Sequence, residues 1–392
     1  MVGAALALAL AREGFSVVLL EAAPPELEWD DSGYDLRVSA LTRASQQLLA
    51  NLGVWQAIVA DRATPYEHMH VWDRAGLGEI HFEAADLGEP DLGHIVENRV
   101  VVRALWRALD AAGVRVQAPA QLRMLVADED GATLQLADRS RLRAGLVVGA
   151  DGARSQVRRL VDIHSRSEAY DQHAVVATVH AERGNRSTAW QRFMPDGPLA
   201  LLPMGRDLFS IVWSTTPEEA ARLCAMPEEA FNERLTQASE ARLGALALQG
   251  GRAAFPLRLQ HAEEYVRPGL ALVGDAAHVI HPLAGQGVNL GFLDAAALVD
   301  ALGAGRDHGR APGSLRTLRV YERSRRGHNT ATQLAMDGFK HLFGTGFAPV
   351  ALLRNLGLGA AGRLPPLRRL FERVALGGGL ELPTLSRPRQ RP

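Results

Sequence analysis

The hydrophobic pattern at the start of the chain predicts a helix followed by a buried strand. Residues 1–12 (MVGAALALALAR) are almost all apolar helix formers, and Gly14 ends this run. Residues 15–20 (FSVVLL) are typical of a strand, and Glu21 follows directly. No Lys or Arg precedes the apolar run, and Arg12 interrupts it. The pattern therefore disfavours a secretory signal or a membrane span here.

The order helix, glycine, strand and acid matches the second half of a dinucleotide-binding βαβ unit. In that unit glycines let the backbone approach a pyrophosphate at a helix N-terminus, and an acid about 20 residues further on binds a ribose. Gly3 and Glu21 have the spacing of the third glycine and that acid. The preceding strand and two glycines would lie upstream of Met1, so we expect the first strand to be missing and the true start to lie upstream. An ordinary α/β helix–strand pair is the alternative.

The same pattern predicts further elements over most of the chain. We expect helices over 44–52, 100–112, 217–243 and 288–302, and strands over 122–127, 132–137, 142–148 and 270–273. Asp130-Gly131 predicts a two-residue hairpin turn. From about residue 174 alternating segments predict an antiparallel sheet, over 174–181, 187–194, 199–204, 208–214 and 252–259. The chain from 315 onward is expected to be helical and basic.

Composition narrows the class of protein. The chain has 392 residues, a net charge of −1 and 47% hydrophobic residues, which suits one large or two moderate domains and gives no argument for nucleic-acid binding. A single cysteine, Cys224, excludes internal disulfides and multi-thiolate metal sites. We find no 18-residue apolar window, and a cytoplasmic location is the default.

The segment 270–302 (LALVGDAAHVIHPLAGQGVNLGFLDAAALVDAL) is the richest in candidate chemistry. It predicts a strand, an acid at the strand's end, a Pro/Gly loop and a helix whose N-terminus faces that loop. Asp275 is placed to bind a polyol hydroxyl, and Gly285 and Gly287 let the backbone close on a flat ligand. Amides near Val288 and Asn289 would face an anion. A plain strand–loop–helix connection is the alternative.

This segment resembles the flavin-proximal motif of class A FAD-dependent aromatic hydroxylases. The resemblance implies that Gly274 and Asp275 bind the ribityl chain of FAD. It also implies that residues 282–289 line the flavin ring, which makes Pro282, Gly285 and Gly287 the candidate catalytic environment. No acid or base and no metal ligand is assigned, because the cofactor supplies the chemistry.

Three other segments extend the resemblance. VVGADGARSQVRR (147–159) resembles the motif in which Asp151, Gly152 and Arg154 would serve the FAD pyrophosphate and NAD(P)H. RVSALTRASQQLLANLGVW (37–55) and GHIVENRVVVRALW (93–106) resemble the ubiquinone-biosynthesis branch of this family. There Arg37 would contact FAD phosphate or adenosine, and Asn98 the flavin nucleotide. A surface ion pair and a helix cap, respectively, are the alternatives.

The resemblance implies an α/β fold with three parts. Residues 1–65, 92–172 and 260–314 would form a discontinuous Rossmann-like FAD-binding domain. An antiparallel-sheet substrate domain (66–91 and 173–259) would be inserted into it, and 315–392 would form a C-terminal helical region.

The implied activity is FAD-dependent hydroxylation of a polyprenylated phenol or quinol with NAD(P)H and O₂. The segments SIVWSTTPEEA, YERSRR and LLRNLGL resemble the 2-polyprenylphenol hydroxylases within this branch. A prenyl reductase, a halogenase (which would be expected to carry a W-x-W-x-I-P stretch, absent here) and a non-catalytic truncated homologue are the alternatives.

Some features allow two interpretations. Residues 340–377 carry six Lys/Arg against one acid, Glu372, which suits a peripheral contact with the inner membrane or a ubiquinone-biosynthesis complex, or else a solvated cap. His278 and His281 are interpreted as loop packing, with a substrate or proton-relay role as the alternative. Trp190, Phe193 and Trp213 either belong to the core or line an aromatic pocket.

Overall fold

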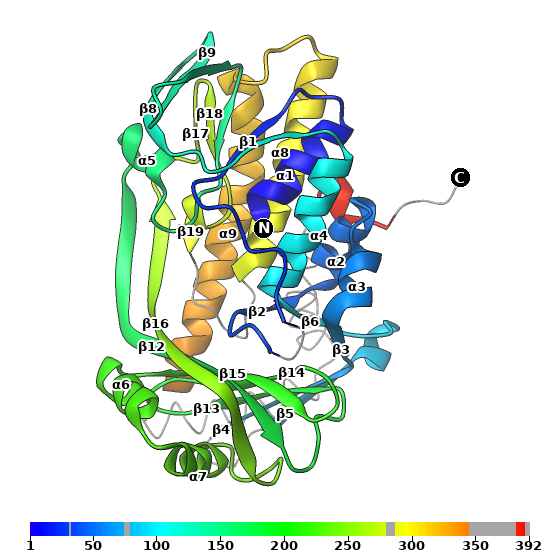
Figure 1. Ribbon diagram of the computed structural model, residues 1–392, viewed down its shortest axis with the longest axis vertical. Coiled ribbons are helices and arrows are strands. Elements are labelled where there is room, and N and C mark those ends of the chain that lie inside the picture. Colours follow the sequence, from blue (N-terminus) through cyan, green and yellow to red (C-terminus); the bar gives the residue numbers. More distant parts are fainter. Residues whose placement is uncertain (31–32, 74–78, 280–286, 345–381, 389–392) are drawn as a thin grey trace.

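The computed structural model describes residues 1–30, 33–73, 79–279, 287–344 and 382–388. It is elongated: a helical part with several small sheets lies above a broad sheet, and the long helix α9 (Leu315–Gly344) runs from one part toward the other (Figure 1). In the helical part α1 (Val2–Arg12) lies between α4 (Asn98–Ala111) and α8 (Gly287–Asp307), and α9 packs on α8. The predicted helix at the start of the chain is confirmed.

Short parallel strands accompany these helices. β1 (Val18–Leu20) pairs with β7 (Arg115–Gln117), and β11 (Val147–Gly149) pairs with β18 (Leu270–Leu272), which also carries β17 (Val266–Arg267). The predicted single strand over 142–148 is wrong, because β10 (Arg141–Ala144) and β11 belong to different sheets. The chain passes from one sheet to the other at Gly145, where a Cβ atom would lie 3.0 Å from Pro312.

A three-stranded meander covers one end of this part. It consists of β8 (Leu122–Asp128), β9 (Gly131–Leu136) and β10. The hairpin is confirmed, but its loop residues are Glu129 and Asp130, because Gly131 already pairs with Asp128. A second three-stranded sheet joins β2 (Val38–Leu41), β6 (Gly93–Glu97) and β3 (Ala63–Tyr66). The helices α2 (Arg43–Asn51) and α3 (Trp55–Arg62) connect β2 to β3.

The broad sheet has eight strands in the order β19-β16-β12-β15-β14-β13-β4-β5. Their bounds are β4 His68–Asp73, β5 Glu79–Glu83, β12 Ser165–Ala181, β13 Thr188–Phe193, β14 Leu199–Pro203, β15 Leu208–Thr215, β16 Leu246–Ala262 and β19 His278–Val279. The sheet is not purely antiparallel as predicted, because β4 and β13 are parallel. Such a pair needs a long connection, and here more than a hundred residues separate the two strands.

Two helices pack against this sheet in place of the single helix predicted over 217–243. α6 (Pro217–Ala225) ends before Pro227, and α7 (Glu228–Ala238) begins after it, because proline lacks the N–H that a continuous helix needs. Buried apolar side chains of α6 and α7 form one core with the sheet. Trp213 belongs to this core and Trp190 packs against it, which supports core packing for both.

Four short helices complete the described chain: α5 (Gln156–Leu160) and the 3₁₀ turns η1 (Ala84–Leu87) and η2 (Gly274–Ala276) lie within it, and η4 (Thr384–Ser386) lies near its end. Backbone atoms of residues 384–387 bind Asn51 of α2 and Asp300 of α8. The prediction of no 18-residue apolar window was wrong, since α8 is long and apolar enough to cross a membrane. However, 72% of its apolar window is buried inside the protein, as in a core helix.

Candidate functional site

Three backbone segments from distant parts of the chain meet at the start of α1. A Cβ atom on Gly3 would lie 3.1 Å from Ala150, which follows β11. A Cβ atom on Gly291 of α8 would lie 2.6 Å from Val2 and 3.3 Å from the Cα of Gly274. Glycine at these positions therefore lets α1, the β11 loop, η2 and α8 approach closely. The predicted glycines Gly3 and Gly274 both lie at this junction.

Three predicted side chains place their charges around the same point. Glu21, Asp275 and Arg37 all act on the amino group of Met1: burial lowers its pKa, the two acids raise it and Arg37 lowers it. Asp275 keeps contact with solvent, but the surrounding protein desolvates its carboxylate and raises its pKa. The positive charges of His278 and Arg37 oppose that shift. Residues far apart in sequence thus form one polar cluster.

Arg37 and Asn98 lie side by side. The backbone N–H of Asn98 donates to the carbonyl oxygen of Arg37 at 2.9 Å, and the Ser39 hydroxyl donates to the Asn98 side chain at 2.6 Å. Asn98 is the first residue of α4, and the cap position belongs to Glu97, so the helix-cap interpretation of Asn98 is wrong. The Arg37 side chain is exposed and free to approach a ligand.

The start of α8 is fixed to the β2–α2 connection by Asn289. Its amide donates to Ala40 at 2.8 Å and its oxygen accepts from the backbone of Thr42 at 3.0 Å and from Ser45 at 2.7 Å. The buried Asn289 side chain is therefore occupied by protein groups. Any anion would meet the backbone amides of Gly287 and Val288 instead, since the first turn of a helix leaves its N–H groups unpaired. Pro282, Gly285 and His281 lie outside the described residues.

Asp151 organises the loop after β11. Its carboxylate accepts from Ser155 at 2.5 Å and from the backbone N–H groups of Gln156 and Val157 at 2.7 and 3.0 Å. It thus caps α5, while Gly152 adopts the left-handed φ of 79° that the loop requires. Arg154 is exposed. Contact of these three residues with a cofactor stays a prediction.

Sequence reasoning missed two buried residues of this site. Arg158 of α5 donates to the carbonyl oxygen of Ala276 at 2.7 Å and so touches the turn that carries Asp275. Asp294 of α8 accepts from the backbone N–H of Gly274 at 3.1 Å and lies 2.5 Å from Nε2 of His278. His278 is therefore an ion-pair partner in the core. An acid with apolar neighbours on both sides in α8 was the available signal.

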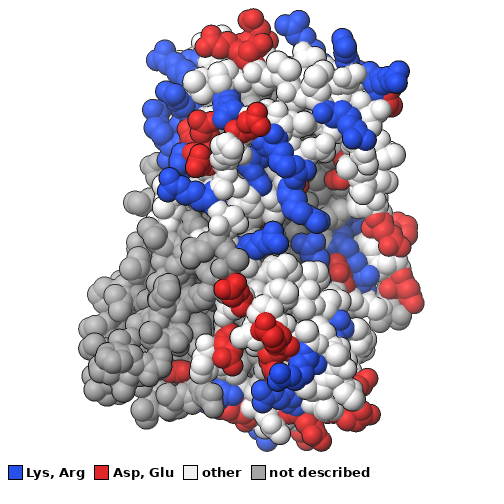
Figure 2. All heavy atoms as spheres, turned by 90° about the vertical axis from the view of Figure 1, so that its left-hand side faces the viewer, with Lys and Arg blue, Asp and Glu red and all other residues white. Residues whose placement is uncertain are grey.

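Positive side chains gather beside this site. Figure 2 shows many of them over the upper half of the face where α5 and the meander lie, among acidic side chains, and both signs of charge also occur below. The exposed arginines of these elements and their loops are Arg123, Arg139, Arg141, Arg143, Arg154 and Arg159, and the exposed acids of the meander are Asp128, Glu129, Asp130 and Asp138.

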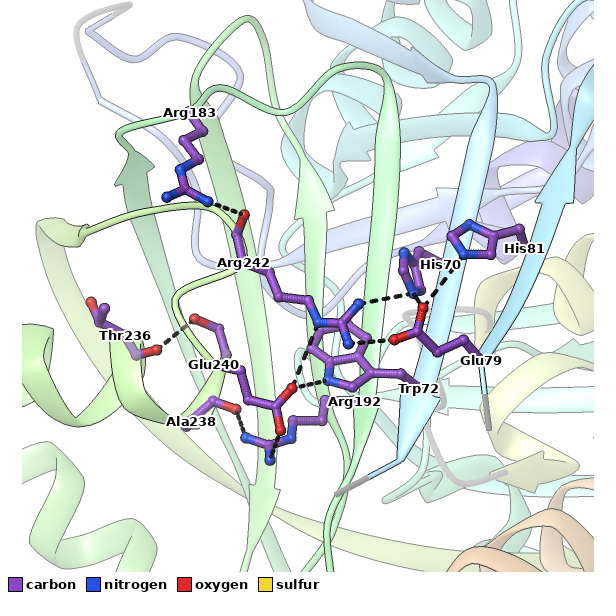
Figure 3. A network of polar contacts seen from close by, with 11 residues as sticks. His70, Trp72, Glu79, His81, Arg183, Arg192, Thr236, Ala238, Glu240 and Arg242 are labelled. Carbon is purple, nitrogen blue, oxygen red and sulfur yellow. Dashed lines mark hydrogen bonds and ion pairs between the residues drawn. The ribbon is translucent and has the colours of Figure 1, made fainter. Parts of the chain in front are cut away.

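A second polar network lies in the broad sheet, where the chain after α7 meets β4, β5 and β13 (Figure 3). His70, Glu79 and His81 bring ligand atoms within 4.8 Å of one another, a spacing that could hold a metal ion. Arg242 already pairs with Glu79 and donates to Nε2 of His70 at 3.3 Å. A metal ion at this position would have to displace that guanidinium. Burial and the charge of His81 lower the pKa of His70 to about 4.

The residues of the first cluster fit FAD. Close backbone approach at Gly3, a helix start at Gly287, an acid after β1 and a second acid in η2 are the features that a dinucleotide with a polyol chain requires. The fit rests on Gly3, Gly274 and Gly291, which let α1 approach the loop after β11, η2 and α8 closely, and on the carboxylates of Glu21 and Asp275, which lie near the start of α1. Fold and site together define the class of FAD-dependent monooxygenases.

Comparisons with known proteins agree. A family model described as "FAD binding domain" matches residues 1–335. The chain is 42% identical over 379 residues to the 3-demethoxyubiquinol 3-hydroxylase of Escherichia coli (strain K12), covering 96% of each chain. It is 40% identical over 391 residues to the ubiquinone hydroxylase UbiL of Rhodospirillum rubrum, covering 99% of this chain and 90% of that one. Human COQ6, a mitochondrial ubiquinone biosynthesis monooxygenase, is 38% identical over 421 residues, which cover 94% of this chain and 89% of that one.

Solved structures share the fold. The p-nitrophenol 4-monooxygenase PnpA of Pseudomonas putida aligns with a TM-score of 0.75 at 21% identity, over 97% of this chain and 96% of that one. PqsL of Pseudomonas aeruginosa aligns with a TM-score of 0.73 at 24% identity, over 92% of this chain and 96% of that one. The chain belongs to the ubiquinone-biosynthesis hydroxylases, a family of FAD-dependent monooxygenases that use NAD(P)H.

Proposed function

We propose that this protein hydroxylates the aromatic ring of a polyprenylated phenol or quinol with FAD, NAD(P)H and O₂. When bound, FAD supplies the redox and oxygen-transfer chemistry, and the protein binds it, orients the ring and excludes water. The observation that carries the proposal is the convergence of Gly3, Glu21, Arg37 and Asp275 on the start of α1.

Each residue of the cluster has a role in this proposal. Asp275, in η2, accepts hydrogen bonds from the ribityl hydroxyls, and Glu21 accepts them from the adenosine ribose. Arg37 neutralises a phosphate, with Asn98 beside it. The amides at the start of α8 (Gly287, Val288 and Asn289) face the electron-rich edge of the flavin ring, because the helix dipole favours negative charge there.

In this proposal the cofactor and the substrate are bound by different domains. The discontinuous domain (1–65, 92–172 and 260–314) holds FAD, and the sheet domain (66–91 and 173–259) holds the prenylated ring. The nicotinamide co-substrate is bound transiently by Asp151, Gly152 and Arg154, next to the exposed arginines of α5 and the meander. The basic segment 340–377, most of which lies outside the described residues, contacts an anionic membrane surface or other enzymes of the same biosynthesis, which places the protein in the cytoplasm at the inner membrane.

FAD titration of the full chain tests the site. Asp275→Ala should weaken FAD binding, because the ribityl hydroxyls lose a charged acceptor worth about 1.5–3 kcal/mol. Asp307→Ala, at the exposed end of α8, is the control and should bind FAD like the wild type. Equal affinities in all three proteins would remove Asp275 from the cofactor site.

Complementation tests the substrate. The resemblance of SIVWSTTPEEA favours 2-polyprenylphenol, whereas the 42% identical relative is named for demethoxyubiquinol. Expression in bacterial strains blocked at each ring-hydroxylation step should restore ubiquinone in one of them. Restoration in none of these strains by a protein that carries FAD would contradict the proposal.

A further inference from the structure

The turn that carries Asp275 is held at both ends by one buried carboxylate. Oδ2 of Asp294 accepts the backbone N–H of Gly274 at 3.1 Å and lies 2.5 Å from Nε2 of His278. Gly274 precedes Asp275 directly, and His278 follows it by three residues. The two contacts therefore bracket Asp275 and fix the path of the backbone on both sides of it.

The other oxygen of Asp294 is anchored to α9. It accepts from Nε of Arg325 at 2.8 Å and from the amide of Asn329 at 3.1 Å, and Arg325 also donates to Asn329 at 2.8 Å. Asp294 and Asn329 are 0% and 1% exposed, so the network is shielded from water. Two long helices thus hold the carboxylate in place while it holds the turn.

Asp294 is ionised in this network. Burial alone would raise the pKa of its carboxyl, but the charges and hydrogen bonds of His278 and Arg325 outweigh burial and hold the pKa well below its ordinary value. A buried charge network of this kind is often no more stabilising than apolar side chains of the same volume. Apart from Asn289 at its first turn, the other buried residues of α8 are apolar, so packing alone does not account for an acid at this position.

We propose that Asp294 is a positioning residue for the cofactor, which fixes Asp275 in its binding position before FAD arrives. The inference rests on the proposed contact between Asp275 and the ribityl chain, and it does not depend on which ring is hydroxylated. Preorganisation of this kind raises the affinity for FAD, because no part of the binding free energy is then used to order the turn. An amide at position 294 could satisfy Arg325 and Asn329 with its oxygen. Its NH₂ group would then face the N–H of Gly274, and that contact would be lost.

The test is FAD binding by the full chain with Asp294→Asn. We expect the dissociation constant for FAD to rise about tenfold to a hundredfold, the range found when groups that support the ligands of a bound metal are removed. At saturating FAD the visible circular dichroism of the bound flavin should also change. A dissociation constant within about twofold of the wild type, with an unchanged spectrum, would overturn the proposal.

Glu240→Gln is the matched control. Glu240 accepts from Nε1 of Trp72 at 3.1 Å and from Arg192 at 2.5 Å, in the second polar network of the broad sheet (Figure 3). This variant should lower the melting temperature and leave FAD affinity and the flavin spectrum unchanged. If it weakens FAD binding as much as Asp294→Asn does, general destabilisation explains both, and the proposal fails.

A milder variant covers the case in which Asp294→Asn does not fold. His278→Gln removes one contact to the turn and leaves the contact between Asp294 and Gly274. A weaker FAD affinity and an altered flavin spectrum are expected, and wild-type values for both would overturn the proposal. Failure of the proposed cofactor site is seen separately, as unchanged FAD affinity in Asp275→Ala.

Discussion

Arg158 and Ala276 are 118 positions apart in the sequence, yet Nη1 of Arg158 donates to the carbonyl oxygen of Ala276 at 2.7 Å. The second guanidinium nitrogen, Nη2, donates to the carbonyl oxygen of Ala153 at 2.8 Å. Arg158 is buried, and that burial lowers its pKa. One side chain therefore connects the loop after β11 to the turn that carries Asp275, and so joins two segments of the candidate cofactor site.

Arg158→Met should destabilise the protein. It leaves the buried carbonyl oxygen of Ala276 and the partly buried one of Ala153 without this charged donor, and hydrogen bonds to charged groups contribute about 1.5–3 kcal/mol each. We expect a loss of about 2–4 kcal/mol in the free energy of unfolding, measured by urea denaturation. The neighbouring exposed Arg159, changed to Met, should stay within about 0.5 kcal/mol of the wild type. Equal effects of the two changes would refute the role given to Arg158.

Gly291→Ala should separate α1 from α8. The new Cβ atom would lie 2.6 Å from Val2 and 3.3 Å from the Cα of Gly274, so the helices or η2 must shift. Overpacking of this kind costs about 1–3 kcal/mol. Gly303→Ala in the same helix meets nothing within 4 Å and should be neutral, or stabilising by up to about 1 kcal/mol. Melting temperatures of both variants check the contrast, and a stabilised Gly291→Ala would contradict it.

Local pattern was enough to predict part of the fold and site. α1, β1 and the strand–turn–helix around Asp275 follow from hydrophobic periodicity and glycine placement, which depend on neighbouring residues. The break between α6 and α7 could also have been predicted, because Pro227 ends a helix wherever it occurs in the interior. The parallel pairing of β4 with β13 could not, since it depends on how two distant segments meet.

The residues that sequence reasoning missed act through tertiary contacts. Asp294 is an acid among apolar neighbours, which marks it as buried and paired, but nothing near it in sequence indicates Arg325 or Gly274 as its partners. Arg158 lies within the segment 147–159, but the motif that this segment resembles indicates Arg154, which is exposed. A sequence motif shows which residue types occur together. Only the packed structure shows which of these side chains contact the turn that carries Asp275.

His70 should make the stability of the protein depend on pH. Burial and the charge of His81 lower its pKa to about 4, below the ordinary value of 6.5, while Glu79 opposes the shift. As the pH falls below 6.5 the unfolded chain takes up the proton first, so stability is lost between about pH 6.5 and pH 4. His70→Gln should reduce this loss by about 1–3 kcal/mol.

The control is His68→Gln, an exposed position on the same strand. Denaturation at several pH values measures both slopes, and identical slopes in wild type and His70→Gln would exclude this role.

Asp275→Asn should change stability and cofactor affinity in opposite directions. Burial raises the pKa of Asp275 above its ordinary value of 3.8, against the opposing charges of His278 and Arg37. The ionised carboxylate is therefore unfavourable in the folded protein without FAD, and the neutral amide should raise the free energy of unfolding at neutral pH. The wild type should recover this difference as the pH falls through the raised pKa, because protonation then favours the folded state. FAD binding should nevertheless weaken, since the amide is a poorer acceptor for ribityl hydroxyls.

Denaturation of the FAD-free protein from pH 7 to pH 4, together with FAD titration, measures both effects, with Asp307→Asn as the exposed control. A variant that is less stable than the wild type at pH 7 and binds FAD equally well would contradict both the desolvation of this charge by the surrounding protein and its role in holding the cofactor.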